Sequence, residues 1–381
     1  MKNQYIILTG GKNNAGDHLI KHRAKKLFQW LKPDTNIIDL NGWEYLTDEQ
    51  LEMINNSKAL ILTGGPALNN KMYPNIYALR DNLDDIKVPL LTMGIGWHSQ
   101  KGEWRDTHNY VLDNQSLKLL KKINDSGYMS SVRDYHTLNV LHSLGMKNFL
   151  MTGCPALYSK ENLNEDFPET LDIKKIAYSL GVSLKTSDKM YEQMQSVLLM
   201  IKELFPSAEI KAVFHHSPTE EYLETHGANK NLYYAQKKYL DWLKSNDFNY
   251  VDISGSADNL VNYYSQVDFH IGYRVHAHIF TNSISKPSVL LNEDGRGKAL
   301  AKVLGGMIFN AYDSMNDAVI YKVLRKLSIK VDNYNQSKFL VNDLRNSIYY
   351  ELENGIKFSQ PRIEIDRHFH VMKQFIGQLP K

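Results

Sequence analysis

Residues 269–298 have the sequence FHIGYRVHAHIFTNSISKPSVLLNEDGRGK, and this stretch decides the fold. An apolar strand is expected from Val267 to Gly272, and a short apolar helix from Val275 to Ile284. The turn Ser285-Lys286-Pro287 separates this helix from a second buried strand, Ser288 to Leu291. Two buried strands that are joined by a helix are typical of a parallel sheet with both faces covered.

Basic side chains follow both of these strands. Arg274, His276 and His278 come after the first strand, and Arg296 and Lys298 come after the second. In an open α/β sheet, ligands bind at this edge. Arginine offers a planar fork to a carboxylate or phosphate, and histidine titrates near neutral pH. The stretch therefore indicates a small, multiply anionic ligand, with Arg274 and His276 as the stronger candidates.

The same residues also have structural explanations. An arginine at a strand end is often part of a surface ion pair. His276 and His278 are two positions apart and cannot share one helix face, so one of them is expected to pack inside.

The N-terminal half alternates apolar strands and helices in the same way. We expect strands at Tyr5–Thr9, Asn36–Leu40, Ala59–Thr63, Pro89–Met93, Met129–Val132 and Asn148–Thr152. We expect helices at Asp17–Leu31, Thr47–Asn55, Tyr73–Leu83, Gln115–Ile123 and Tyr135–Leu144. In the second of these helices, Thr47 and Gln50 resemble a capping box.

The second half repeats the plan after a polar linker, Lys160 to Lys174. Its other expected strands are Lys175–Leu180, Glu209–Phe214 and Tyr250–Ile253. Its other expected helices are Met190–Phe205, Leu232–Ser245, Ala257–Gln266 and Lys298–Leu304. From Asp313 the pattern is helical, with Lys338–Glu353 and Ile363–Gly377 as the longest pieces.

This alternation predicts an α/β protein with two doubly wound, Rossmann-like domains. Residues 1–160 form the first domain, residues 170–330 form the second, and residues 331–381 form a helical tail that can pack back on the first. Two such domains that face each other across a cleft resemble the GT-B fold.

Composition narrows the class of protein. The chain has 381 residues, of which 43% are hydrophobic and 23% charged, as is ordinary for a soluble protein of two domains. Its net charge of +3 is too small to predict nucleic-acid binding. The one cysteine, Cys154, leaves no internal disulfide and fits a reducing compartment.

Targeting and membrane segments are not expected. The N-terminal MKNQYIILTGG lacks the long apolar region and cleavage site of a signal peptide. No run approaches the roughly 20 apolar residues of a membrane span. The sequence therefore predicts a cytoplasmic protein, and peripheral association with a membrane stays open.

More candidate site residues follow the strands of the first domain. Asn14 and Asp17 lie between the first strand and the first helix, where a glycine frees backbone N–H groups for an anion. Asp17 is either a helix N-cap or a carboxylate that binds a sugar hydroxyl or takes its proton. Gly64 and Gly65 form the turn after the third strand, where glycine is usually turn chemistry.

The next strands end in larger side chains. Trp97 offers a stacking face for a sugar, and His98 beside it offers a proton donor or acceptor. Arg133 forms either an internal ion pair with Asp134 or part of an anion site. No compact set of ligands predicts a metal, because the adjacent pair His215-His216 would diverge on a strand.

Together these motifs resemble the polysaccharide pyruvyl transferase family over roughly Leu8 to Lys298. The motifs, in the family's order, are N-x-G-D at Asn14 to Asp17, ILTGGPAL, MGIG, SVRDYHTLNVLHSLG, TGCPALY, GVSLK, and GYRVHAHIF with the downstream Lys298. Two departures stand out: the first glycine run has two glycines where the family often has three, and Cys154 replaces the usual aspartate before the proline.

The resemblance implies an enzyme that moves the enolpyruvyl group of phosphoenolpyruvate to hydroxyls of a sugar in polysaccharide or exopolysaccharide biosynthesis. A pyruvate ketal and phosphate are the implied products. Phosphoenolpyruvate is the donor substrate, and no cofactor is implied. The implied partners are this donor, bound on the second domain, and a sugar or lipid-linked oligosaccharide acceptor, bound on the first.

This chemistry assigns a role to each candidate. Arg274, Arg296 and Lys298 are expected to hold the phosphate and carboxylate, with Arg133 behind them. His276 is the expected general acid, which protonates the methylene carbon. Asp17 or His98 is expected to orient or deprotonate the acceptor. The other candidates for substrate binding are Trp97, Asn14, Gly64, Gly65 and His278.

Two other functions stay open from the sequence. A GT-B glycosyltransferase that uses a nucleotide sugar shares the architecture and also needs cations. A catalytically degenerate homologue that binds a glycan is favoured by Cys154 in place of the aspartate.

Overall fold

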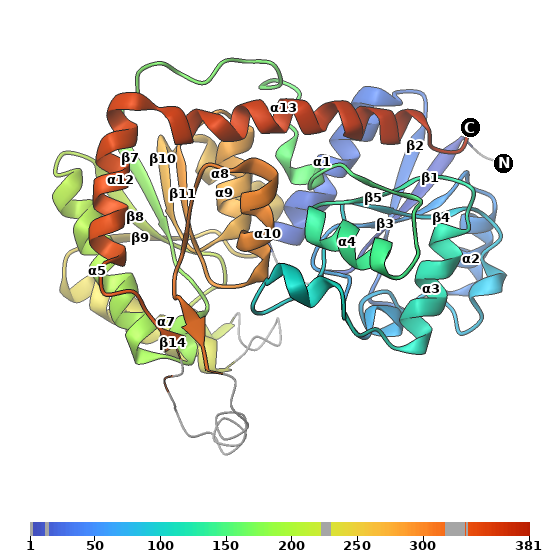
Figure 1. Cartoon of the computed structure of the whole chain (residues 1–381), viewed down its shortest axis with the longest axis horizontal. Coiled ribbons are helices and arrows are strands. Elements are labelled where there is room, and N and C mark those ends of the chain that lie inside the picture. The colour runs from blue at the N-terminus through green and yellow to red at the C-terminus, as the bar shows by residue number, and fades with distance from the viewer. Residues whose placement is uncertain (1–2, 12–14, 222–229, 317–331, 333) are drawn as a thin grey trace. The chain divides into compact units, whose positions relative to one another are not determined.

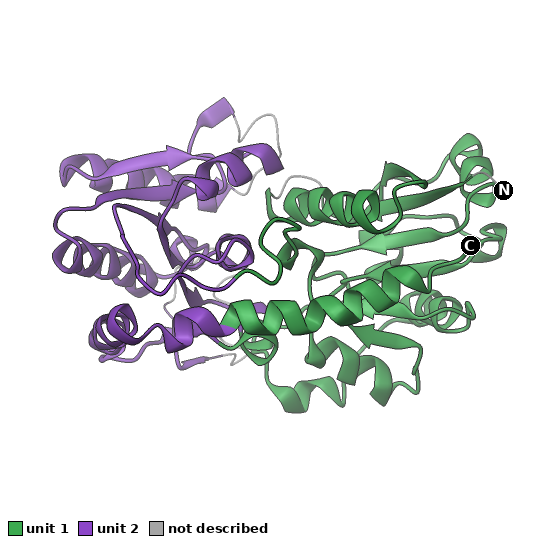
Figure 2. Ribbon diagram, turned by 90° about the horizontal axis from the view of Figure 1, so that it is seen from above, with its two compact units in different colours: residues 1–165, 298–305, 361–381 green, residues 166–297, 306–360 purple. Residues whose placement is uncertain are grey.

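The computed structural model describes residues 3–11, 15–221, 230–316, 332 and 334–381. The chain divides into two compact units (Figure 2). Unit 1 comprises Met1–Glu165, Lys298–Gly305 and Pro361–Lys381, and unit 2 comprises Asp166–Gly297 and Gly306–Gln360. One change of unit falls in the expected linker. The structure also divides the expected tail, because residues up to 360 belong to unit 2 and later ones to unit 1.

Unit 1 is built on a parallel sheet in the order β2-β1-β3-β4. Its strands are β1 (Gln4–Thr9), β2 (Asn36–Asn41), β3 (Leu60–Thr63) and β4 (Leu90–Met93). The parallel pair β5 (Ser130–Val132) and β6 (Phe149–Met151) adjoins β4, because Ile95 bridges Val132 and the Gly94 N–H donates to the Ser131 carbonyl over 3.0 Å. The strand order reverses between β1 and β3, which makes this the switch point of the sheet.

The helices of unit 1 are α1 (Ala15–Leu31), α2 (Asp48–Asn55), α3 (Asn114–Asn124) and α4 (Tyr135–Ser143). Every residue of β1 is buried. A strand that is buried along its whole length is the pattern of a parallel sheet with both faces covered. The continuous apolar run at Tyr5 to Thr9 predicts this strand for the same reason.

Unit 2 holds a parallel sheet of six strands in the order β12-β11-β10-β7-β8-β9. The strands are β7 (Lys175–Ser179), β8 (Glu209–Phe214), β9 (Asn249–Asp252), β10 (Phe269–Gly272), β11 (Ser288–Asn292) and β12 (Met307–Asn310). This is the strand order of dinucleotide-binding Rossmann folds, and its switch point lies between β7 and β10. The two parallel sheets confirm the predicted fold class of two Rossmann-like α/β units.

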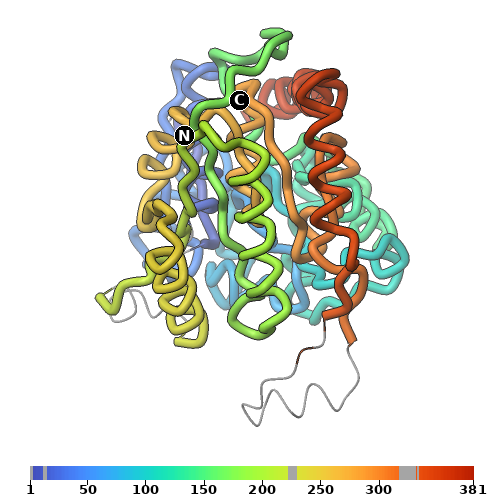
Figure 3. The backbone as a smooth tube through the Cα atoms, turned by 90° about the vertical axis from the view of Figure 1, so that its left-hand side faces the viewer, coloured from blue at the N-terminus to red at the C-terminus, as the bar shows by residue number. Residues whose placement is uncertain are grey.

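The helices of unit 2 are α5 (Asp188–Leu204), α7 (Lys230–Ser245), α8 (Ala257–Ser265), α9 (Val275–Ser283) and α12 (Leu340–Asn354). Figure 1 shows the sheet of each unit with helices around it. Helix α12 packs beside α5 (Figure 3), where an ion pair joins Arg345 to Glu203. A short antiparallel pair, β13 (Ser314–Met315) and β14 (Tyr334–Asn335), precedes α12.

Two helices run across changes of unit along the chain: α10 (Gly295–Leu304) and α13 (Ile356–Gly377). The part of α13 in unit 1 packs on that unit, because the ring of Phe369 stacks on Trp30 with a centroid distance of 5.0 Å. The hydroxyl of Tyr5 donates to the carbonyl of Pro380 over 2.5 Å. Among the described residues, no helix has both the length and the apolar composition of a membrane span.

Three local predictions were wrong or incomplete. The expected helix Tyr73–Leu83 is instead the short turn η1 (Met72–Ile76) followed by irregular chain. Tyr73 is extended, with φ −125° and ψ 132°, because the ring of the following Pro74 disfavours the helical conformation. Strand β12 was not predicted, and neither was the pair β13–β14, whose strands have only two residues each and are too short for a clear period.

Candidate functional site

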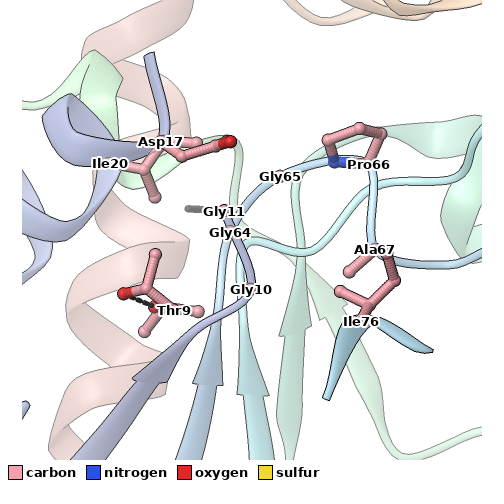
Figure 4. A pocket seen from close by; sticks show the side chains of 11 residues that line it. Thr9, Gly10, Gly11, Asp17, Ile20, Gly64, Gly65, Pro66, Ala67 and Ile76 are labelled. Atoms are coloured by element: carbon pink, nitrogen blue, oxygen red, sulfur yellow. Dashed lines mark hydrogen bonds between the residues drawn. The ribbon is translucent and has the colours of Figure 1, made fainter. Parts of the chain in front are cut away.

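A pocket of about 150 Å³ opens at the switch point of the unit 1 sheet (Figure 4). We call it the unit 1 pocket. It is lined by Thr9, Gly10, Gly11, Asp17, Ile20, Thr63, Gly64, Gly65, Pro66, Ala67 and Ile76. These residues come from the ends of β1 and β3, the first turns of α1 and the loop after β3. A sheet of this type binds ligands at this place.

Asp17 is the one ionisable side chain among the residues that line the unit 1 pocket. It lies in the first turn of α1, and its carboxylate points to the turn after β3 in Figure 4. A side chain at Gly11 would overlap this carboxylate, and a Cβ at Gly65 would lie 3.3 Å from Oδ1. The glycines at both strand ends therefore leave room for the carboxylate. Gly64 and Gly65 also have φ of +63° and +69°, which favour glycine.

Trp97, another expected acceptor residue, does not line the unit 1 pocket. Asn14 lies outside the described residues. Trp97 is fully buried, and its indole stacks on His136 with centroids 5.1 Å apart. Trp97 therefore does not present a stacking face, because its ring is part of the interior of unit 1. His98, the next residue, is exposed.

Arg133 and Asp134 form the internal ion pair that the sequence left open. The Arg133 Nε lies 3.4 Å from Asp134 Oδ2, and the guanidinium packs on Gly96, where a Cβ would overlap it. Asp134 Oδ1 also accepts from the backbone N–H of Thr137 over 2.7 Å and caps α4. Cys154 is near these groups, and burial raises the pKa of its thiol to about 11, so the thiol stays neutral.

Unit 2 gathers cations at its own switch point. Arg274 follows β10 directly, and its backbone N–H donates to Ser179 Oγ at the end of β7 over 3.1 Å. Its guanidinium Nη2 lies 3.2 Å from Nδ1 of His216, which follows β8. Burial first of all, and then the charges of Arg274, Lys185 and Arg296, lower the pKa of His216 to about 3. His216 is therefore neutral and accepts from Arg274. We call Arg274, Lys185, Arg296 and this neutral histidine the cationic cluster.

The remaining two expected cations have partners. Arg296 makes a bidentate ion pair with Asp294, with Nη2 to Oδ2 at 2.7 Å and Nε to Oδ2 at 2.9 Å. Lys298 belongs to unit 1 and lies 2.7 Å from Glu103 Oε1. The structure thus brings Arg296 near Arg274 but does not place Lys298 in the same unit.

The two histidines of α9 differ in surroundings. His276 is the second residue of the helix, two positions after Arg274, and is 7% exposed. His278 is fully buried, its Nδ1 lies 2.7 Å from Ser288 Oγ, and burial lowers its pKa to about 3. His278 is therefore the histidine of this pair that packs inside and does not reach a ligand.

Glu293 was not predicted as a site residue from the sequence. Its carboxylate accepts from the backbone N–H groups of Val182 over 2.9 Å and of Ser183 over 3.0 Å, and from the Ser183 hydroxyl. A Cβ at Gly181 would overlap this carboxylate. The Glu293 carboxylate therefore accepts the hydrogen bonds of the backbone N–H groups that follow β7, at the switch point of the unit 2 sheet. The glycine in GVSLK was the available signal, but the partner lies 110 residues away from Ser183.

Clusters of three or more side chains that could hold a metal ion are absent from the part of the chain that the structure describes.

Comparison with solved structures gives distant likenesses. UDP-GlcNAc 2-epimerase from Neisseria meningitidis, bound to UDP-GlcNAc, has 11% identity and a TM-score of 0.48, with 99% of each chain covered. S. aureus MnaA, in a co-structure with UDP, has 12% identity and a TM-score of 0.47, with 92% of this chain and 97% of that chain covered. The wall teichoic acid polymerase TagF has 12% identity and a TM-score of 0.42, with 99% and 90% covered. At these TM-scores, the likenesses do not extend to activity or ligands.

No curated protein matches the chain. A family model does match, and it covers both switch points. The model described as polysaccharide pyruvyl transferase aligns with residues 14–295, a range that begins before Asp17 and ends after Arg274 and Glu293. Because this match spans well over half of the chain, the protein belongs to the polysaccharide pyruvyl transferase family.

Proposed function

We propose that this protein transfers a pyruvyl group from phosphoenolpyruvate to two hydroxyls of a saccharide, with a ketal and phosphate as products. The observation that carries the proposal is the cationic cluster at the switch point of unit 2. Phosphoenolpyruvate carries a phosphate and a carboxylate, and a guanidinium binds either group in two-point fashion. Arg274 is only partly buried and is held by Ser179 and His216, so its fork has a fixed position.

The chemistry begins with a proton. In our proposal His276 protonates the methylene carbon of the donor, and positive charge develops at the neighbouring carbon. A hydroxyl oxygen of the saccharide attacks that carbon and loses its proton. The bond to the phosphate oxygen then breaks, and its electron pair leaves with the phosphate. A second hydroxyl attacks the same carbon and gives its proton to the departing phosphate, which closes the ketal. General acid catalysis of this kind contributes about a hundred- to ten-thousand-fold in rate.

On the acceptor side we assign the unit 1 pocket and Asp17. A carboxylate can accept the hydrogen bond of a hydroxyl and take its proton. The other lining residues are glycines, apolar residues and two threonines, so Asp17 is the ionisable group among them that can do this. The replacement of the family aspartate by Cys154 leaves a neutral, buried thiol in that place.

A nucleotide-sugar glycosyltransferase is the main competing function, and Glu293 argues against it. A diphosphate that binds at the switch point of such a sheet uses free backbone N–H groups after the first strand. In this chain those of Val182 and Ser183 donate to the Glu293 carboxylate. A diphosphate held through these N–H groups would have to displace the Glu293 carboxylate, whereas the proposed phosphoenolpyruvate site uses the side chains of the cationic cluster.

Thermal unfolding with different ligands tests the proposal. A ligand at about 100 times its dissociation constant stabilises the folded state by about 2.7 kcal/mol. We expect a rise in Tm with phosphoenolpyruvate that exceeds the rise with inorganic phosphate at the same concentration. A rise with UDP-, GDP- or CMP-sugars, and none with phosphoenolpyruvate, would overturn the proposal in favour of a glycosyltransferase.

A further inference from the structure

Unit 1 also carries an aromatic stack that ends at the surface. The stack runs from buried Trp97 through His136 to Trp104 in η3 (Trp104–Thr107). His136 is 1% exposed, and the Trp104 ring meets it edge-on at a centroid distance of 4.9 Å. The backbone N–H of Trp97 donates to Thr137 Oγ1 over 2.8 Å, which ties the stack to α4. Trp104 itself is 42% exposed.

This support makes Trp104 different from a loosely held surface side chain. A ligand that covers an exposed indole removes apolar surface from contact with water. An indole whose ring is already held in place loses little conformational entropy when it is covered. Flat aromatic rings with a polar surround are typical of recognition surfaces. The Trp104 ring is therefore suited to stack against a flat, partly apolar face of a ligand.

Cations surround the ring. The Lys302 Nζ lies 5.5 Å from the Trp104 ring centroid, and Lys298, one turn earlier on α10, pairs with Glu103 at 2.7 Å. The hydrogen bond from Lys298 lowers the pKa of Glu103, and the charges of Lys298, Arg105 and Lys101 lower it further. Three basic side chains thus lie around the Glu103 carboxylate, and a fourth, Lys302, lies over the Trp104 ring, so the surface around the ring has a positive local charge.

We propose that Trp104, Lys298 and Lys302 form a subsite for an anionic sugar unit, one that carries a carboxylate or a phosphate. The C–H face of a pyranose ring is apolar and flat enough to lie on the indole, and its charged substituent meets the lysines. The subsite deepens the proposed function, on which it rests, because it makes the acceptor of the transferase an anionic saccharide. It also replaces Trp97, which is buried, as the stacking residue of unit 1.

Calorimetric titration of the whole protein tests this subsite. The probes are trigalacturonate, which carries carboxylates, glucose 6-phosphate, which carries a phosphate, and neutral maltotriose. We expect one or both charged probes to bind more tightly than maltotriose and to weaken as salt is added, because the contact is partly electrostatic. The charged probe that binds more tightly identifies the anionic group, carboxylate or phosphate, that the subsite prefers. Equal affinity for all three probes, or no binding of either charged probe, would overturn the proposal.

Variants separate stacking from charge. Trp104→Ala is expected to lower the affinity for the tighter-binding charged probe about tenfold, the equivalent of about 1.4 kcal/mol. Trp104→Phe is expected to restore most of that affinity. Lys302→Gln is expected to reduce the salt dependence. Tyr349→Ala removes an aromatic ring that is 59% exposed in unit 2 and serves as the matched control.

The two proposals fail in different ways. Unchanged affinity in Trp104→Ala would contradict the subsite, whatever the result with phosphoenolpyruvate. If Trp104→Ala loses the saccharide while phosphoenolpyruvate still raises its Tm, both stand. If the wild type binds the charged saccharide and phosphoenolpyruvate has no effect on its Tm, the subsite stands and the donor assignment fails.

Discussion

At the scale of single residues, Asp17 and Arg274 occupy corresponding places in the two units. Each lies at the switch point of a parallel sheet, and each owes its position to backbone groups and small residues of the neighbouring strand. Gly65 leaves room for the carboxylate of Asp17, and the Ser179 hydroxyl holds the backbone of Arg274. The residues beside Asp17 and Arg274 therefore constrain where these two residues lie.

Asp17→Asn tests the role of the acceptor carboxylate. Asparagine has nearly the same shape but cannot take a proton, so we expect turnover to fall by about a hundred- to ten-thousand-fold. Phosphoenolpyruvate binding is expected to be unchanged, because Asp17 belongs to unit 1. Phosphate release and the Tm rise with the donor measure the two effects. Full turnover in Asp17→Asn would exclude the carboxylate from the reaction.

Gly11→Ala tests the close approach of β1 to Asp17. The added methyl group would overlap the Asp17 side chain, which must then move. We expect turnover to fall as it does in Asp17→Asn, with a loss of stability in urea unfolding of about 1–3 kcal/mol from overpacking. Gly377→Ala is the matched control, because its Cβ would meet nothing within 4 Å. Equal effects of the two alanines would show that the overlap is irrelevant.

At the scale of elements, the strands were the most predictable part of the chain. Buried parallel strands such as β1 and β3 are continuous apolar runs between turns, and that pattern is visible in the sequence. The helix expected at Tyr73 failed because Pro74 overrides the apolar spacing. Candidate residues at strand ends could be named, but their partners could not, since Arg274 and His216 lie 58 positions apart.

Arg296 and Lys298 are two residues apart on α10 and were expected to serve one anion, and the boundary between the two units falls between them. Their ion pairs, with Asp294 and with Glu103, reflect this division. Contacts between residues far apart in the sequence depend on how whole elements pack. A local sequence pattern does not predict these contacts.

The capping box of α2 gives a test at this scale. The Thr47 hydroxyl accepts from the Gln50 backbone N–H over 3.2 Å, and the Gln50 side chain accepts from the Thr47 N–H over 3.0 Å. We expect Thr47→Ala to lower the free energy of unfolding by about 1 kcal/mol, and Thr47→Ser to change it little. Urea unfolding curves provide the measurement. Identical midpoints for the two variants would mean that the box adds no stability.

At the scale of the whole molecule, buried neutral histidines link stability to pH. Burial lowers the pKa of His278 to about 3, and it also lowers the pKa values of His215 and His270 well below the ordinary range. The unfolded chain binds protons below about pH 6.5, whereas these folded groups do not. Stability is therefore present above that pH and is lost as the pH falls toward 3.

Urea unfolding at two pH values tests this linkage. For one histidine that shifts from about 6.5 to about 3, the free energy of unfolding is lower by about 2 kcal/mol at pH 5 than at pH 7. We expect the whole protein to lose at least this much, and His278→Gln to lose less because glutamine does not titrate. A variant with the same pH dependence as the wild type would contradict the assignment of His278.

The central claim is that the cationic cluster of unit 2 binds phosphoenolpyruvate. The most direct measurement is calorimetric titration of the donor into the wild type, Arg274→Ala, and the matched control Arg345→Ala, whose guanidinium pairs with Glu203 elsewhere in unit 2. We expect the wild type and the control to bind alike, and Arg274→Ala to bind at least about tenfold more weakly, since charge-assisted bonds are worth about 1.5–3 kcal/mol. Equal donor affinity in all three proteins, or no binding to the wild type, would contradict the account.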